Sequence, residues 1–207
     1  MAVLVLAGVT GRTSSACYKG IRPSTTTERT FHVETLRIVK TAMPQPAVGW
    51  RVAEETEVRP PRLMCIGQEQ EPLPLEYRIA YRRAGGSPQG SADGPAPAES
   101  ATDARIDIDV NPRGMPFSEA VETLTVPGTA LALRSGPDSS STVYLLFGDW
   151  SIEATGSSAS LATAHLVSDG PYTKVQALAV RISGDRADAD VLAGRIRLDA
   201  LAALLLR

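Results

Sequence analysis

The chain has 207 residues, of which 43% are apolar and 5% aromatic, and its 21 Lys and Arg against 23 Asp and Glu give a formal charge of -2. This length suits one domain, and no Lys/Arg cluster forms a stripe that could follow phosphates, so we predict no nucleic-acid partner. No apolar run reaches the roughly 20 residues that span a bilayer, so we also predict no transmembrane segment.

The N-terminus resembles a signal peptide. Residues 2–9, AVLVLAGV, have the length of a signal-peptide apolar region, and Ser14 and Ala16 place small residues before a cleavage site at Cys17. We predict that residues 1–16 direct the protein to the periplasm, the outer envelope or the medium. Cys17 would then be a candidate lipid anchor, although Ser14 stands where lipoproteins usually carry Leu.

A second interpretation of the same residues is a nucleotide-binding turn. The segment MAVLVLAGVTGRT resembles the first strand and glycine loop of the atypical short-chain dehydrogenase and NmrA-like families. Gly8 and Gly11 match that loop, and Ser14 replaces its third glycine; the resemblance implies a dinucleotide on this loop. Gly20 and Pro23 interrupt the helix that should follow, so we predict no cofactor and keep dinucleotide binding as the alternative.

The two cysteines are Cys17 and Cys65. In an exported chain such a pair predicts one disulfide, and two separate thiols are the alternative. The sequence has no C-x-x-C motif and no histidine near these positions, so we predict no metal site.

After an N-terminal arm at residues 17–27, a helix is expected over residues 28–42. Val33, Leu36, Val39 and Met43 recur near helical spacing, Thr30 is a suitable N-cap, and Pro44 stops the helix. Residues 49–58 and 73–83 then alternate between apolar and polar side chains, which predicts two strands that pair antiparallel.

Residues 84–103 interrupt this pattern with a stretch rich in Gly, Pro, Ser and Ala. Such a stretch cannot bury enough apolar surface to offset its ordering entropy, so we predict a flexible loop. We place it within a single domain of residues 28–207.

The next strand pattern turns Asp107, Asp109 and Asn111 away from the core. These residues imitate the first three ligands of a calcium loop, but Pro112 and Ser118 occupy the positions of its obligatory Gly and acid. We predict a solvated strand face here, followed by a helical turn at residues 118–122.

Two strands should form the centre of the sheet, one at residues 142–147 and one at residues 172–184. The first follows a strand through Leu131 and Leu133 in a hairpin, and Trp150 begins an edge strand. The second is apolar on both faces, with Leu178, Val180 and Ile182 on one face and Val175, Ala177 and Ala179 on the other. We therefore predict a sheet covered on both sides.

The chain ends in two short helices. Asp185 or Asp188 can cap the first, Gly194 ends it, and Leu198, Leu201, Leu204 and Leu205 line the second. The fold class is α+β, a mostly antiparallel sheet with an N-terminal helix and two short C-terminal helices packed on it. Its element order is similar to the α/β sandwich of PsbP-like and Mog1-like proteins, with no shared motif.

Candidate chemistry centres on few residues. No serine lies in a G-x-S-x-G motif, and we assign no catalytic residue. Asp149 beside Trp150, together with His165, forms a candidate ligand site. We predict a non-enzymatic extracytoplasmic binding domain for an unknown protein or small molecule; the alternative is a small hydrolase-like enzyme that uses His165 with Asp149 or Asp169.

Overall fold

The fold is built on a seven-stranded sheet in the order β2-β4-β5-β12-β9-β8-β7, with every neighbouring pair antiparallel. The computed structural model describes residues 20–56, 58–67, 71–83, 104–118, 122–154 and 159–206. The predicted signal peptide, Cys17, the glycine turn and the loop at 84–103 lie outside these residues. The strands are β2 (Trp50–Glu55), β4 (Leu75–Arg83), β5 (Ala104–Val110), β7 (Glu122–Leu124), β8 (Leu131–Ser135), β9 (Ser141–Gly148) and β12 (Ala177–Gly184).

The two predicted central strands, β9 and β12, are neighbours in the middle of this sheet. Leu178, Val180 and Ile182 of β12 are fully buried against the helices, because alternate side chains of a strand share one face. The predicted antiparallel pairing of β2 with β4 and the hairpin of β8 and β9 are also confirmed.

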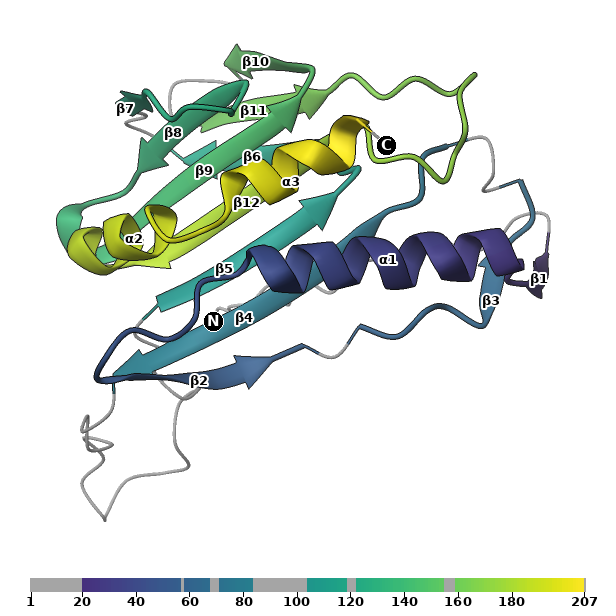
Figure 1. Ribbon diagram of the computed structural model, residues 1–207. Coiled ribbons are helices and arrows are strands. Elements are labelled where there is room, and N and C mark those ends of the chain that lie inside the picture. Colours follow the sequence, from purple (N-terminus) through teal and green to yellow (C-terminus); the bar gives the residue numbers. More distant parts are fainter. Residues whose placement is uncertain are drawn as a thin grey trace, which may run out of the picture.

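Three helices cover one face of the sheet: α1 (Thr26–Ala42), α2 (Arg186–Ala193) and α3 (Leu198–Ala202), which continues into a 3-10 turn at Ala203–Leu206 (Figure 1). None of the helices in the described ranges is long and apolar enough to cross a membrane. Asp185 caps α2 by accepting a hydrogen bond from the Asp188 amide, and Gly194 is its C-cap, as predicted.

The first helix begins two residues earlier than predicted, and its cap is Thr25, not Thr30. The Thr25 hydroxyl accepts from the Glu28 amide at 3.2 Å, and the Glu28 carboxylate accepts from the Thr25 amide at 2.7 Å. This reciprocal capping box outcompetes the isolated hydroxyl of Thr30, because it satisfies two backbone donors at once.

The second face of the large sheet is covered only in part, by a small sheet in the order β10-β11-β6. Its strands are β6 (Gly114–Ser118), β10 (Trp150–Ala154) and β11 (Ala159–Ala164). An apolar cluster joins the two sheets, and it contains Met115, Phe117, Leu133, Tyr144, Leu146, Ala162 and Ala179. The predicted cover on both sides is therefore present over parts of β8, β9 and β12. The uncovered part of the second face carries charged side chains.

Two local predictions were wrong. Gly114–Ser118 is a strand, so the helical turn placed at 118–122 does not begin there; residues 119–121 lie outside the described ranges. Val175 lies before β12 and is buried in the helix-side core, so it does not share the face of Ala177 and Ala179. The alternating pattern begins only at Ala177, because the residues before it follow an irregular path held by Asn111.

A separate two-stranded ribbon lies beside the start of α1. It pairs β1 (Ile21–Pro23) with β3 (Leu63–Cys65), and Ile21 stands opposite Cys65. The arm predicted at 17–27 thus contains a strand, and the ribbon forms the outer wall of the pocket described below.

Candidate functional site

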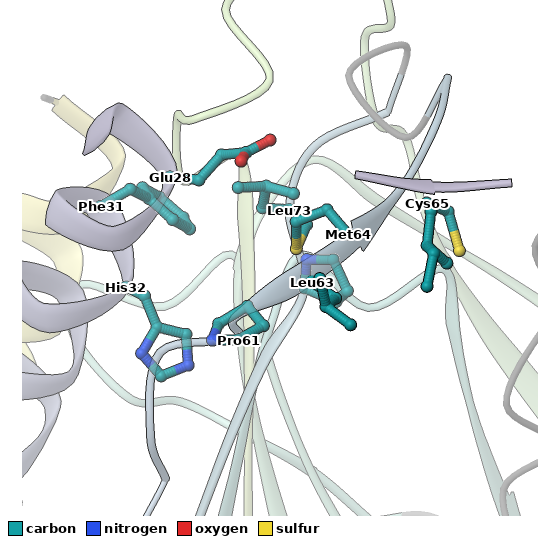
Figure 2. Close-up of a pocket in the computed structure, with 10 residues that line it drawn as sticks. Glu28, Phe31, His32, Pro61, Leu63, Met64, Cys65 and Leu73 are labelled. Carbon is teal, nitrogen blue, oxygen red and sulfur yellow. The ribbon is translucent and has the colours of Figure 1, made fainter. Parts of the chain in front are cut away.

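A pocket of about 260 Å³ lies between the N-terminal half of α1 and the β1–β3 ribbon (Figure 2). We call it the α1 pocket. Its lining is mostly apolar and consists of Ile21, Glu28, Phe31, His32, Pro61, Leu63, Met64, Cys65, Leu73 and Pro74.

The helix contributes three of these side chains because of its periodicity. Glu28, Phe31 and His32 are spaced i, i+3 and i+4, so they project from the same side of α1 (Figure 2). On the opposite wall, β3 is held against β1, and the Ile66 amide donates to the Gly20 carbonyl at 3.0 Å. The pocket therefore has ordered backbone on both sides.

Glu28 is a buried carboxylate at the upper edge of the pocket, with a side-chain exposure of 1%. Arg22 donates to both of its oxygens, at 2.6 Å to Oε1 and 2.9 Å to Oε2, and the Tyr172 hydroxyl donates to Oε1 at 3.3 Å. The hydrogen bond from Arg22 is the main cause that lowers the pKa of Glu28 to about 2. Its charge is thus balanced locally and is not available to a ligand.

His32 differs from Glu28 because its imidazole lacks such partners. The residue is only 8% exposed, and its Nδ1 is buried with no hydrogen-bond partner in the described structure. Burial lowers the pKa of His32, so the imidazole is neutral at pH 7. The pocket wall therefore carries a neutral polar group among apolar side chains.

A second site lies on the uncovered face of the large sheet, where three arginines surround Asp107. Asp107 is opposite Arg78 on one neighbouring strand and opposite Arg181 on the other. Its Oδ1 accepts from Arg78 Nε at 2.6 Å, and its Oδ2 accepts from Arg181 Nη2 at 3.0 Å. Arg105 Nε donates to both oxygens at 2.9 Å. The carboxylate is therefore surrounded by guanidinium groups.

Asp107 corrects the prediction of a solvated strand face. The residue is 5% exposed and lies beneath the arginines. Burial alone would raise the pKa of Asp107, but the hydrogen bonds from Arg105 and Arg78 and the charge of Arg181 together lower it. Asn111, the third member of the predicted face, is also buried and binds the backbone of residues 73 and 174–177.

A polar hollow of about 560 Å³ adjoins this arginine cluster. We call it the arginine hollow. Its lining comprises Arg105, Asp107, Ser139, Ser140, Thr142, Tyr144, Arg181, Ser183, Gly184 and Asp185.

The predicted ligand residues Asp149, Trp150 and His165 do lie near one another. The His165 amide donates to the Asp149 carbonyl at 3.0 Å, so the contact is between backbone atoms, and both side chains are exposed. The Trp150 indole donates to the Phe147 carbonyl at 2.9 Å and packs against the apolar cluster between the sheets. Asp169, the other acid proposed for His165, is exposed as well.

Neither the role of His32 nor the arginine hollow was predicted from the sequence. The available signal for the hollow was an arginine at an outward position on each of three strands, at 78, 105 and 181. Alternation places each arginine on a face, but only the strand order shows that they meet. The predicted disulfide remains a prediction, because Cys17 lies outside the described residues.

No three His, Cys, Asp or Glu side chains lie together as a metal-holding group within the described ranges. Comparison with known proteins found no match to any protein-family model, curated protein or solved structure.

Proposed function

We propose that this chain is a non-enzymatic binding domain, and that its α1 pocket receives a small, uncharged and mainly apolar ligand. The observation that carries the proposal is a pocket with mostly apolar walls that also includes one neutral imidazole, that of His32. Ligand sites commonly combine apolar walls with a small number of polar groups that fix orientation.

The charges around the pocket support an uncharged ligand. Glu28 is already paired with Arg22, and the lowered pKa of His32 keeps the imidazole neutral. A charged ligand would lose its hydration without gaining a counter-ion. A volume of about 260 Å³ suits a molecule the size of one or two small rings.

The same residues support binding over turnover. General acid-base catalysis by His32 would need a second group to orient or receive a proton. The acid on the same side of α1 is Glu28, whose two oxygens accept hydrogen bonds from Arg22. We therefore assign His32 the role of a hydrogen-bonding anchor.

Titration with indole, monitored by ligand-observed NMR, tests this proposal. Indole is flat, neutral and small, and it carries one N–H group; benzothiophene has a similar shape without that donor. We expect indole to bind more tightly than benzothiophene by about tenfold, the range expected for one hydrogen bond to an otherwise unpaired group. Equal binding of the two compounds would contradict the assignment of His32.

A blocking variant locates the binding site. Leu63 lines the pocket and is 56% exposed, so Leu63→Trp should fill the pocket mouth while the chain still folds. Ile152→Trp is the matched control, because Ile152 is an exposed aliphatic residue on β10, away from the pocket. Indole binding should weaken at least about tenfold in the first variant and stay unchanged in the control. The same loss in both variants would place the indole elsewhere.

We further propose that the domain acts outside the cytoplasm, in the periplasm, in the outer envelope or as a secreted protein. The export-like residues 1–16 support this, and a Cys17–Cys65 disulfide fits it. Ile21 pairs with Cys65, so the chain four residues after Cys17 already lies beside its proposed partner. N-terminal sequencing of protein from the native host should begin at or near Cys17; an intact Met1 in a cytoplasmic fraction would contradict export.

A further inference from the structure

The arginine hollow lies on the face of the sheet opposite the helices, and nothing in the proposed function uses it. Arg181 stands between Val180 and Ile182, which are both buried against the helices, so its side chain points to the other face. We propose that this hollow is a second binding site, for a small oxyanion carried by a hydroxylated molecule such as a sugar phosphate or a hydroxy acid.

The charges around the hollow favour an anion. Arg78, Arg105 and Arg181 all donate to Asp107, so three positive groups converge on one carboxylate. The other acid of the hollow is Asp185. Its Oδ1 caps α2, and its Oδ2 lies 3.8 Å from Arg83. Glu76 and Asp109, which are the next acids along β4 and β5 on this face, do not line the hollow. Arg78 is outside the lining of the hollow but offsets the charge of Asp107, so the charges of Arg105 and Arg181 are not fully neutralised and can attract an anion.

Asp107 leaves several guanidinium donors unused. Arg78 and Arg105 reach Asp107 through their Nε groups, while Arg181 uses Nε and Nη2. Among the described residues, the two terminal nitrogens of Arg105 and one terminal nitrogen of Arg181 make no hydrogen bond. Terminal guanidinium nitrogens form the fork that binds phosphate and carboxylate oxygens in a bidentate manner. Asp107 holds the fork of Arg105 and the free terminal nitrogen of Arg181 in place before any ligand arrives, which reduces the entropy lost on binding.

Hydroxyl groups line much of the hollow. Ser139 and Ser140 come from the 3-10 turn at Asp138–Ser140, and Thr142 and Ser183 face each other across β9 and β12, with their oxygens 3.4 Å apart. Tyr144 also lines the hollow. A hydroxyl can donate to an anion oxygen or bond to a hydroxyl of the ligand, so this lining suits a molecule with both. Neutralising Asp107 needs only the arginines, so the hydroxyl groups point to a further role in binding a ligand.

Calorimetric titration with inorganic phosphate, glucose 6-phosphate, citrate and glucose tests the inference. We expect at least one of the three anions to bind, with affinity falling as sodium chloride is raised, and glucose to show no binding. The phosphate and citrate arms distinguish a phosphate ligand from a carboxylate ligand. Absence of binding by all three anions up to about 10 mM would overturn the proposal, since that affinity is below the range of a specific site.

Three variants locate the anion. Arg105→Gln removes a fork from the hollow, and Arg51→Gln is the control for charge alone, because Arg51 is an exposed residue of β2 outside the hollow. Ser139→Glu adds a negative charge to an exposed residue at the rim, where the fold should tolerate it. Anion affinity should fall at least about tenfold in Arg105→Gln and Ser139→Glu and less than about twofold in Arg51→Gln. Equal losses in Arg51→Gln and Ser139→Glu, with unchanged melting temperatures, would overturn the assignment.

Discussion

Gly148 at the end of β9 lies so close to Gln176 that a Cβ atom at position 148 would approach the Gln176 carbonyl oxygen to 2.4 Å. Gly148 also has a φ of +99°, a conformation that side chains with a Cβ rarely adopt. The bend here separates the large sheet from β10. A glycine is therefore required at this position for two reasons, the positive φ and the close approach of the Gln176 backbone.

Gly148→Ala should accordingly lower the free energy of unfolding by about 3–5 kcal/mol, because it combines backbone strain with a clash against fixed backbone. Gly128→Ala is the control: Gly128 has a φ of +84°, but nothing lies within 4 Å of a Cβ added there. The control should cost about 1–2 kcal/mol. Urea unfolding of both variants measures the difference, and equal losses would show that the close approach to Gln176 is unimportant.

The sequence was most informative where one face of an element is uniformly apolar. In β4 the side chains of Leu75, Tyr77, Ile79 and Tyr81 alternate with polar ones except at Ala80, and all four are buried as predicted. Alternation reports which face a residue occupies, and a run that is apolar on both faces, as in β12, reports a central strand. For these reasons the fold class and the centre of the sheet could be predicted.

The helix α1 shows where this reasoning fails. Its apolar spacing predicted that Val33 faces the core, yet Val33 is 52% exposed, while His32 and Thr35 are buried. The packed face of α1 includes the polar side chains of His32 and Thr35. Hydrophobic periodicity alone therefore assigned the core positions one residue too late in the helix. His32 could not be recognised as a pocket residue for the same reason.

The arginine hollow was unpredictable for a different reason. Arg78, Arg105 and Arg181 come from three strands that are far apart in the sequence. They meet because β5 lies between β4 and β12, in the register that places both Arg78 and Arg181 opposite Asp107. A period of two fixes the face of a residue but leaves strand order and register open.

The lowered pKa of Glu28 predicts a loss of stability in acid. Its pKa is about 2 in the folded chain and 4.5 when exposed, so the folded state favours the charged form. The stabilisation is fully present above about pH 5 and is lost as the pH falls toward 2. Glu28→Gln should lower the free energy of unfolding by about 2–3 kcal/mol at pH 7, and by progressively less as the pH falls toward 3.

Glu34→Gln provides the matched control for this series. Glu34 lies on the same helix with an exposed side chain, so its neutral variant should change stability by less than about 0.5 kcal/mol at either pH. Thermal melting at several pH values gives both comparisons. A Glu28→Gln difference that is the same at pH 3 and pH 7 would contradict the lowered pKa of Glu28.

The lowered pKa of His32 predicts a second change of stability with pH, nearer to neutrality. Burial lowers the pKa of His32 below 6.5, so the unfolded chain takes up a proton that the folded chain resists. Stability should therefore fall as the pH drops below about 6.5, by at most about 2 kcal/mol at pH 5 from this one group. His32→Leu should remove that part of the pH dependence, and it should raise stability at pH 5 because a buried polar group without a partner is lost.

The control for His32→Leu is His165→Ala, because the His165 side chain is exposed. The free energy of unfolding at pH 5 and pH 7.5 should differ by the same amount in His165→Ala and in the parent, and by less in His32→Leu. Chemical denaturation at the two pH values gives these differences. If His32→Leu keeps the full pH dependence of the parent, another group is responsible.

Asp107 gives the last prediction, because it is the common partner of three arginines. Asp107→Asn keeps the shape of the side chain but removes the charge that holds Arg78, Arg105 and Arg181 together. Removing the charge of Asp107 leaves three arginines uncompensated, but their side chains are 36–46% exposed and water screens them, so we expect a loss of about 1–3 kcal/mol. In Asp107→Asn the three arginines repel one another, and a bound anion should relieve this electrostatic repulsion. Added phosphate should therefore raise the melting temperature of Asp107→Asn more than that of the parent, and sodium chloride at equal ionic strength, which only screens the charges, should produce a smaller difference. Equal shifts in the two proteins would show that the arginines do not depend on Asp107 for charge compensation.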